Sequence, residues 1–166
     1  MTAPPPTGRW WVPLDPVATP VGTLGETGAS GLLGLRRTVL RDGRDDLPAS
    51  YPGDDRASTL HLALTDPGGW VVGGVTVRHD PWPGFASLHL VGMAVAPDRQ
   101  RRGVGGVLVG AVQATAAEAG LDVWAAARTT ALDFYRRHGF RPVGPEFTGA
   151  MDLAHRRVLW RSRARR

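Results

Sequence analysis

Residues Ser87–Ala119 read SLHLVGMAV, then APDRQRR, then GVGGVLVGAVQATAAEA. The apolar run predicts a strand, and the basic, glycine-containing turn after it opens a helix. Glycines let the backbone approach a phosphate closely, and a helix N-terminus directs N–H groups and the positive end of its dipole outward. We therefore expect the turn to bind a pyrophosphate. The residues expected to do so are Gln100, Arg101, Arg102, Gly103, Val104, Gly105 and Gly106.

Two other phosphate motifs do not fit this turn. A Rossmann fingerprint needs a third glycine where Leu108 stands, counted from Gly103. A P-loop needs a lysine, and every Lys or Arg position of this chain is an arginine. A glycine-rich turn without a ligand stays the alternative, because the chain contains 22 glycines.

The apolar patterning along the chain predicts a mixed α/β (α+β) fold. The expected order is a strand, one or two helices, a three-stranded meander, a helix, a strand, a helix and two strands. This order gives a central sheet of about six to seven strands flanked by about three to four helices. A T-x-x-D capping box at Thr130 and Asp133 should open the last helix. The expected strands are 17–24, 59–64, 70–78, 87–95, 121–127, 140–143 and 151–160, and the expected helices are 26–41, 104–119 and 130–138.

We expect one domain over residues 17–160, between two tails. Residues 1–16 are rich in proline and lack periodicity, with Trp10 and Trp11 available to pack on the domain. Residues 161–166 are rich in arginine. Six arginines near the end account for the net charge of +5, and without them the chain is close to neutral, so the charge alone does not predict a nucleic-acid partner. These arginines are Arg156, Arg157, Arg161, Arg163, Arg165 and Arg166.

Several classes of protein are excluded by composition. The chain has no cysteine, which excludes disulfides, a cysteine nucleophile and thiolate metal sites. No two histidines lie three or four residues apart, so we expect no helical metal pair. No apolar run approaches the roughly 20 residues of a membrane-spanning helix. The first residues lack a charged segment followed by an apolar one, so we expect a cytoplasmic protein.

A second group of residues follows the central strand. Phe134 and Tyr135 lie on the short helix, and Gly139 and Phe140 follow it. A tyrosine in this position can point its phenol into a cleft at the end of a sheet. A core aromatic residue with a solvated hydroxyl is the alternative.

Both segments resemble the GCN5-related N-acetyltransferase (GNAT) family. GMAVAPDRQRRGVGGVLV carries the family's Q/R-x-x-G-x-G/A pattern at the start of a helix, and ALDFYRRHGF matches a second element, A-x-x-φ-Y-x-x-x-G-F. The resemblance extends over residues 17–160. Arg128 stands where the family often has asparagine, and it is the residue expected at a polar contact to the cofactor.

The resemblance implies acetyl-CoA as co-substrate, no metal, and direct transfer of the acetyl group to an amine. CoA would lie in a V-shaped gap between the strand before the turn and the strand after the long helix. Backbone groups of Met93 and Val95 would run along the pantetheine arm, and an N–H near Met93 or Ala94 would stabilise the oxyanion. Tyr135 corresponds to the general acid that protonates the leaving thiolate.

His89 is the candidate base for the attacking amine. It falls where some family members carry a catalytic glutamate, four residues before Met93. Along a regular strand its side chain shares a face with Val91, Met93 and Val95. A histidine pKa near 6.5 suits a general base. A hydrogen-bonded histidine without a catalytic role is the alternative.

The acceptor is expected to be a primary amine of a small molecule or a protein. It would bind between the first helix, the following loop and the closing strands. The residues expected to contact it are Asp54, Asp55, His61 and His155. The sequence leaves open whether the protein forms a homodimer.

Two other functions remain to be distinguished. A non-catalytic acyl-CoA-binding or regulatory module would keep the glycine turn but lack a proper base, and no Asp or Glu lies on the strand before the turn. A nucleic-acid-binding protein would use the terminal arginines. We do not expect the latter, because the aromatic platforms of RNA-binding sheets are missing.

Overall fold

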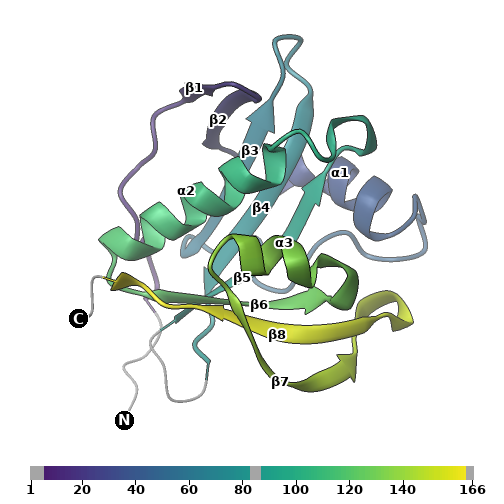
Figure 1. The fold of residues 1–166 in the computed structure, drawn as a ribbon. Helices are drawn as coiled ribbons and strands as arrows, with labels where there is room; N and C mark the ends of the chain where they lie inside the picture. The colour runs from purple at the N-terminus through teal and green to yellow at the C-terminus, as the bar shows by residue number, and fades with distance from the viewer. Residues whose placement is uncertain (1–5, 83–86, 164–166) are drawn as a thin grey trace.

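The computed structural model describes residues 6–82 and 87–163, and the outer ends of both expected tails, 1–5 and 164–166, lie outside them. One mixed sheet of eight strands in the order β1-β2-β3-β4-β5-β6-β8-β7 confirms the α+β class (Figure 1). The strands are β1 (Val17–Thr19), β2 (Gly22–Glu26), β3 (Thr59–Thr65), β4 (Val71–His79), β5 (Ser87–Val95), β6 (Asp122–Arg128), β7 (Arg141–Thr148) and β8 (Ala154–Trp160). The helices are α1 (Ser30–Leu40), α2 (Val104–Glu118) and α3 (Leu132–Arg137), with 3₁₀ turns at Pro97–Arg99, Thr129–Ala131 and Ala150–Asp152.

Two adjacent glycines of β4 show which helix covers which face of the sheet. A Cβ at Gly73 would meet Val104 and Leu108 of α2, whereas a Cβ at Gly74 would meet Leu32 of α1. Successive strand residues point to opposite faces, so α1 and α2 pack on opposite sides of the sheet (Figure 1). In both cases the nearest side-chain atom would be 2.5 Å away, so neither position has room for a larger residue.

Helix α2 covers the more apolar face of the sheet. It ends at Glu118, and Gly120 shortly after it takes a φ of 67°, which favours glycine. Val109 is buried, whereas Val107 and Ala111 are half-buried. Among the described residues, no helix is both long and apolar enough to cross a membrane. The buried residues of α2 are Val104, Leu108, Val109, Val112, Thr115 and Ala116.

The N-terminal part differs from the prediction in two ways. Segment 17–24 folds as part of the β1–β2 hairpin rather than as one strand, which is why the sheet has eight strands. Helix α1 begins at Ser30 and not at Glu26, because Glu26 ends β2 and pairs with β3. The Glu26 carboxylate accepts hydrogen bonds from Trp11 Nε1 and from the Leu14 N–H, both at 2.9 Å, so the segment before β1 is held against the sheet.

The short helix α3 also begins differently. Thr129–Ala131 forms a 3₁₀ turn, α3 begins at Leu132, and no side chain caps it. The predicted capping box at Thr130 and Asp133 is therefore wrong. Asp133 instead forms an ion pair with Arg136, one turn along the helix, at 3.1 Å.

Strand β8 lies inside the sheet, between β6 and β7, and is antiparallel to both. It begins at Ala154 rather than at Met151, because Met151 takes a φ of 61° in the preceding turn. Strand β7 extends to Thr148, further than the predicted 140–143.

Candidate active site

A gap opens in the middle of the sheet between β5 and β6. The parallel pairing of these strands ends at Leu90 opposite Ala125, although β5 continues to Val95 and β6 to Arg128. Beyond the last pair, the facing backbone groups of the two strands are not bonded to each other. The structure thus contains the V-shaped gap that the family resemblance implies.

A β-bulge in β5 lies at the start of this gap. Gly74 of β4 is opposite Ala94, and Thr76 is opposite Val91, so β5 carries one extra residue here. Gly92, within the bulge, takes a φ of 61°, which favours glycine. A bulge bends its strand, and this one lies where β5 leaves β6.

The bulge changes which side chains share a face of β5. His89 and Val91 face α1, whereas Met93 and Val95 pack against the core beneath α2. The expectation that all four share one face is therefore wrong, because it assumed a regular strand. His89 lies on the side of the sheet that α1 and the following loop cover only in part.

The glycine turn leads into α2 without a capping side chain. Gly103 has a φ of 87° and Arg101 a φ of 61°, which is uncommon for a residue with a side chain. Within the described part of the chain, none of the backbone N–H groups of residues 100–106 has an acceptor. Such a row of N–H groups at a helix N-terminus is suited to an anion. Gln100 Nε2 donates to the Val95 carbonyl at 3.2 Å and ties the turn to the end of β5.

Two glycines of the turn also have a packing role. A Cβ at Gly105 would lie 3.1 Å from the Phe134 ring, and one at Gly106 would lie 3.1 Å from the His138 ring. Helix α3 therefore lies against the first turn of α2. This contact brings the second predicted group of residues, with Tyr135, beside the glycine turn.

A cavity of about 330 Å³ lies where the gap meets the α1 side of the sheet. It unites five residues that the sequence singled out, namely Tyr135, His89, Met93, Arg128 and His155. Its lining also includes Arg41 and Tyr51, from the helix and loop expected to border the acceptor, and Arg78 and Phe147, which were not predicted.

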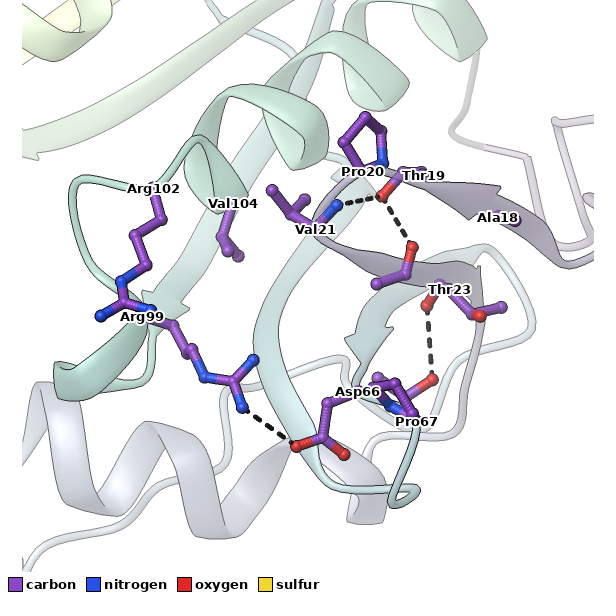
Figure 2. Close-up of a pocket in the computed structure, with 12 residues that line it drawn as sticks. Ala18, Thr19, Pro20, Val21, Thr23, Asp66, Pro67, Arg99, Arg102 and Val104 are labelled. Atoms are coloured by element: carbon purple, nitrogen blue, oxygen red, sulfur yellow. Dashed lines mark hydrogen bonds and ion pairs between the residues drawn. The ribbon is translucent and has the colours of Figure 1, made fainter.

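A larger hollow of about 600 Å³ adjoins the other side of the glycine turn. It is lined by the β1–β2 hairpin, by the turn after β3, and by Arg99 and Arg102 (Figure 2). Figure 2 shows that the Arg99 guanidinium pairs with Asp66, at 3.3 Å. This hollow shares no lining residue with the cavity beside Tyr135. Of the two, only the smaller cavity contains both candidate acid–base residues.

His89 is held by neighbours from three strands and a turn. Its Nδ1 lies 3.1 Å from Asp80 Oδ2 and 3.5 Å from a guanidinium nitrogen of Arg78. Its ring stacks on Trp124 with centroids 3.6 Å apart. Burial, and then the positive charge of Arg78 and of Arg157, lower the pKa of His89 to about 4, against the opposing effect of Asp80. His89 is therefore neutral at pH 7, and the expectation of a pKa near 6.5 is wrong.

The low pKa of His89 predicts an acid-sensitive fold. The unfolded chain takes up a proton on this residue below about pH 6.5, whereas the folded protein does so only near pH 4. The free energy of unfolding should therefore fall as the pH drops through this window, by up to about 3 kcal/mol. Urea unfolding at pH 7.5 and pH 4.5 measures this loss. In His89→Gln most of the difference should vanish, and an unchanged difference would contradict the prediction.

Tyr135 is buried between two aromatic rings on the cavity side of α3. Its ring centroid lies 5.3 Å from that of Phe134 and 5.2 Å from that of Phe140, both edge to face. Burial raises the pKa of Tyr135 well above its usual value, so the phenol keeps its proton. No hydrogen bond joins its hydroxyl to any residue that the structure describes. The proton is therefore available to a group bound in the cavity.

The four residues expected to contact the acceptor do not gather in one place. Asp54 forms a buried ion pair with Arg36, at 2.6 Å, and His61 donates or accepts through both ring nitrogens within the same cluster. Asp55 is exposed and does not line the cavity. His155 does line it, with Nδ1 donating to a backbone carbonyl at 2.8 Å.

The fold and this arrangement were compared with known proteins. Comparison with curated protein sequences gives no match. Among solved structures, Escherichia coli ElaA is 16% identical with a TM-score of 0.70, over 82% of this chain and 98% of that one. An acyl-CoA N-acyltransferase from Pseudomonas aeruginosa is 19% identical with a TM-score of 0.67, over 79% and 88%. An aminoglycoside 6′-N-acetyltransferase complexed with coenzyme A is 15% identical with a TM-score of 0.64, over 82% and 94%. These likenesses show the fold.

The sequence itself shows to which family the chain belongs. Residues 56–142, just over half of the chain, match the model of the acetyltransferase (GNAT) domain. The matched segment runs from the strand pair before the gap, through the glycine turn, to the residues after Tyr135. This chain therefore belongs to the GNAT family of acetyltransferases.

Proposed function

We propose that the protein is an N-acetyltransferase that uses acetyl-CoA and transfers the acetyl group directly to a primary amine. The observation that carries this proposal is the gap between β5 and β6, with unbonded N–H groups of residues 100–106 at one end and Tyr135 beside it. The N–H groups bind the pyrophosphate of the co-substrate, and Tyr135 holds a proton for the leaving thiolate. The structural neighbour with coenzyme A bound supports the same co-substrate.

In this reading the turn and the strands bind and orient acetyl-CoA. The N–H groups of residues 100–106 hold the pyrophosphate, and the open edge of β5 at Met93 and Val95 receives the pantetheine arm as an added strand. A backbone N–H near Met93 or Ala94 stabilises the negative charge that develops on the carbonyl oxygen. Tyr135 gives its proton to the sulfur as the thiolate leaves.

His89 accepts the proton that the amine loses. Asp80 contacts Nδ1 of His89, so Nε2 is the nitrogen that can accept a proton from the amine. A base with a pKa of about 4 cannot remove a proton from an ammonium group efficiently. The amine therefore has to arrive neutral, and His89 takes its proton after the nitrogen has bonded to carbon and become acidic.

The binding step is tested by a charge reversal in the turn. In Arg101→Glu/Arg102→Glu we expect the Kd of acetyl-CoA, measured by calorimetry, to rise at least about tenfold, because two carboxylates now face the phosphates. Arg161→Glu/Arg163→Glu is the matched control, since it changes the charge equally at the far end of β8 from the gap. An equal loss in both variants would mean that the turn is not the phosphate site.

Catalysis is tested by release of CoA in the presence of primary amines. The proposed transferase releases CoA when a suitable amine is added. The non-catalytic acyl-CoA-binding module predicts acetyl-CoA binding without release from any amine. Weak binding of acetyl-CoA in the unmodified protein would contradict both.

A further inference from the structure

Two arginines meet at the C-terminal end of α1. Arg41 Nη1 donates to the Leu40 carbonyl oxygen at 3.0 Å, and Arg128 Nη2 donates to the same oxygen at 3.3 Å. One arginine follows α1 and the other ends β6, so the fold brings them together from distant parts of the sequence. Both line the cavity that contains Tyr135 and His89.

Among the described residues, the two positive charges have no acidic partner. Neither Arg41 nor Arg128 forms an ion pair with a carboxylate in the described ranges 6–82 and 87–163. Of the described residues that line the cavity, none is Asp or Glu. Two carboxylates that contact lining residues of the cavity already have partners, because Asp54 pairs with Arg36 and Asp80 contacts His89 and Arg78. The partial negative charge of a helix C-terminus offsets only part of two full positive charges.

Several guanidinium nitrogens of Arg41 and Arg128 are available to donate hydrogen bonds to a ligand. Among the described residues, Nε and Nη1 of Arg128 and Nη2 of Arg41 have no acceptor. Both side chains are half-buried, which strengthens their interaction with an anion relative to open solvent. Guanidinium groups match the two oxygens of a carboxylate in geometry as well as in charge.

Building on the proposed function, we propose that the acceptor is a small amine that also carries a carboxylate, which Arg41 and Arg128 bind. The carboxylate lies at the end of α1, and the amino group points toward the gap between β5 and β6. A cavity of about 330 Å³, shared with the reacting end of the co-substrate, suits a small molecule. Its lining, with Arg78 as a third arginine, disfavours polyamines and other polycationic acceptors. Arg128 then contacts the acceptor, and not the cofactor as the family resemblance implied.

Matched pairs of amines test this proposal. The panel consists of the common amino acids, β-alanine and γ-aminobutyrate, each compared with its carboxamide, together with spermidine. Release of CoA is followed at saturating acetyl-CoA. For at least one pair, kcat/KM for the carboxylate should exceed that for the carboxamide by about 10-fold or more. Equal or faster turnover of the carboxamides or of spermidine overturns the proposal.

Substitutions of Arg128 and Arg41 then show whether these two residues cause the preference for a carboxylate. In Arg128→Gln, and separately in Arg41→Gln, KM for the preferred carboxylate should rise about 10- to 100-fold, with less than about threefold change for its carboxamide. Arg44→Gln is the control, because Arg44 is exposed and pairs with Asp46 outside the cavity. A loss of the same size for carboxylate and carboxamide would assign both arginines a structural role instead.

A binding measurement separates this proposal from the proposed function. Calorimetry with the CoA-bound protein measures binding of the same panel without turnover. Binding of a carboxylate that disappears in Arg128→Gln supports the arginine site even if no CoA is released, in which case only the transferase activity fails. Release of CoA from carboxamides alone supports the activity and overturns the arginine site. The arginine site is also overturned if no carboxylate of the panel binds.

Discussion

Replacing Tyr135 with phenylalanine is expected to lower kcat by about 10²- to 10⁴-fold, the range typical of a lost general acid. The variant keeps the ring and therefore its edge-to-face contacts with Phe134 and Phe140. It removes a hydroxyl that has no hydrogen-bond partner among the described residues, so stability should hardly change. Steady-state CoA release at saturating acetyl-CoA and amine measures the effect.

The other tyrosine of the chain supplies the control for this experiment. Tyr51 lines the same cavity, and Tyr51→Phe also removes one phenolic hydroxyl. Its kcat should change by less than about threefold, because the ring still contacts the guanidinium groups of Arg36 and Arg41. If Tyr135→Phe keeps full turnover, Tyr135 is not the acid. If its acetyl-CoA affinity falls as steeply as its kcat, the hydroxyl serves binding instead.

Replacing Arg36 with methionine is expected to lower the free energy of unfolding by about 3 to 5 kcal/mol, because it leaves a buried carboxylate without its partner. Arg36 is 1% exposed and donates to Asp54, to the Ala49 carbonyl and to Thr76 Oγ1. Burial opposes ionisation of Asp54, but hydrogen bonds from Arg36 and the Tyr51 N–H keep its pKa below the usual value. Urea unfolding at pH 7 measures the loss.

Two further variants show whether the loss comes from this ion pair. Arg36→Met/Asp54→Leu should recover part of the stability, since no charge is then left buried without a partner. Arg37→Met should change the free energy of unfolding by less than about 0.5 kcal/mol, because the Arg37 side chain is 41% exposed and pairs with the exposed carboxylate of Asp45. A loss in Arg36→Met no greater than in Arg37→Met would contradict the role given to the ion pair.

The parts of the site that the sequence predicts are those built by neighbouring residues. The glycine turn is encoded within Gln100–Gly106, and Tyr135 lies in the ten-residue segment ALDFYRRHGF, which contains α3. Strand β5 has the predicted bounds, because it coincides with one continuous, mostly apolar run of the sequence. Local pattern suffices wherever the chemistry and the backbone conformation come from the same short segment.

The parts that could not be predicted depend on contacts between distant segments. The pKa of His89 is lowered by burial in the folded sheet, and further by the charges of Arg78 on β4 and Arg157 on β8. Its face on β5 depends on a bulge whose only local sign is Gly92. Asp80 and Arg128 acquire their partners only after folding, and no spacing in the sequence announces either contact.

The position of β8 has a consequence for the synthesis of the protein. Residues 154–160 pair with β6 on one side and β7 on the other, so neither neighbour completes its hydrogen bonding until this segment has left the ribosome. During translation the nascent chain exposes the edge of β6, the strand that forms one side of the gap. A shortened chain that stops before Ala154 would leave that edge open permanently and would be prone to pair with other chains.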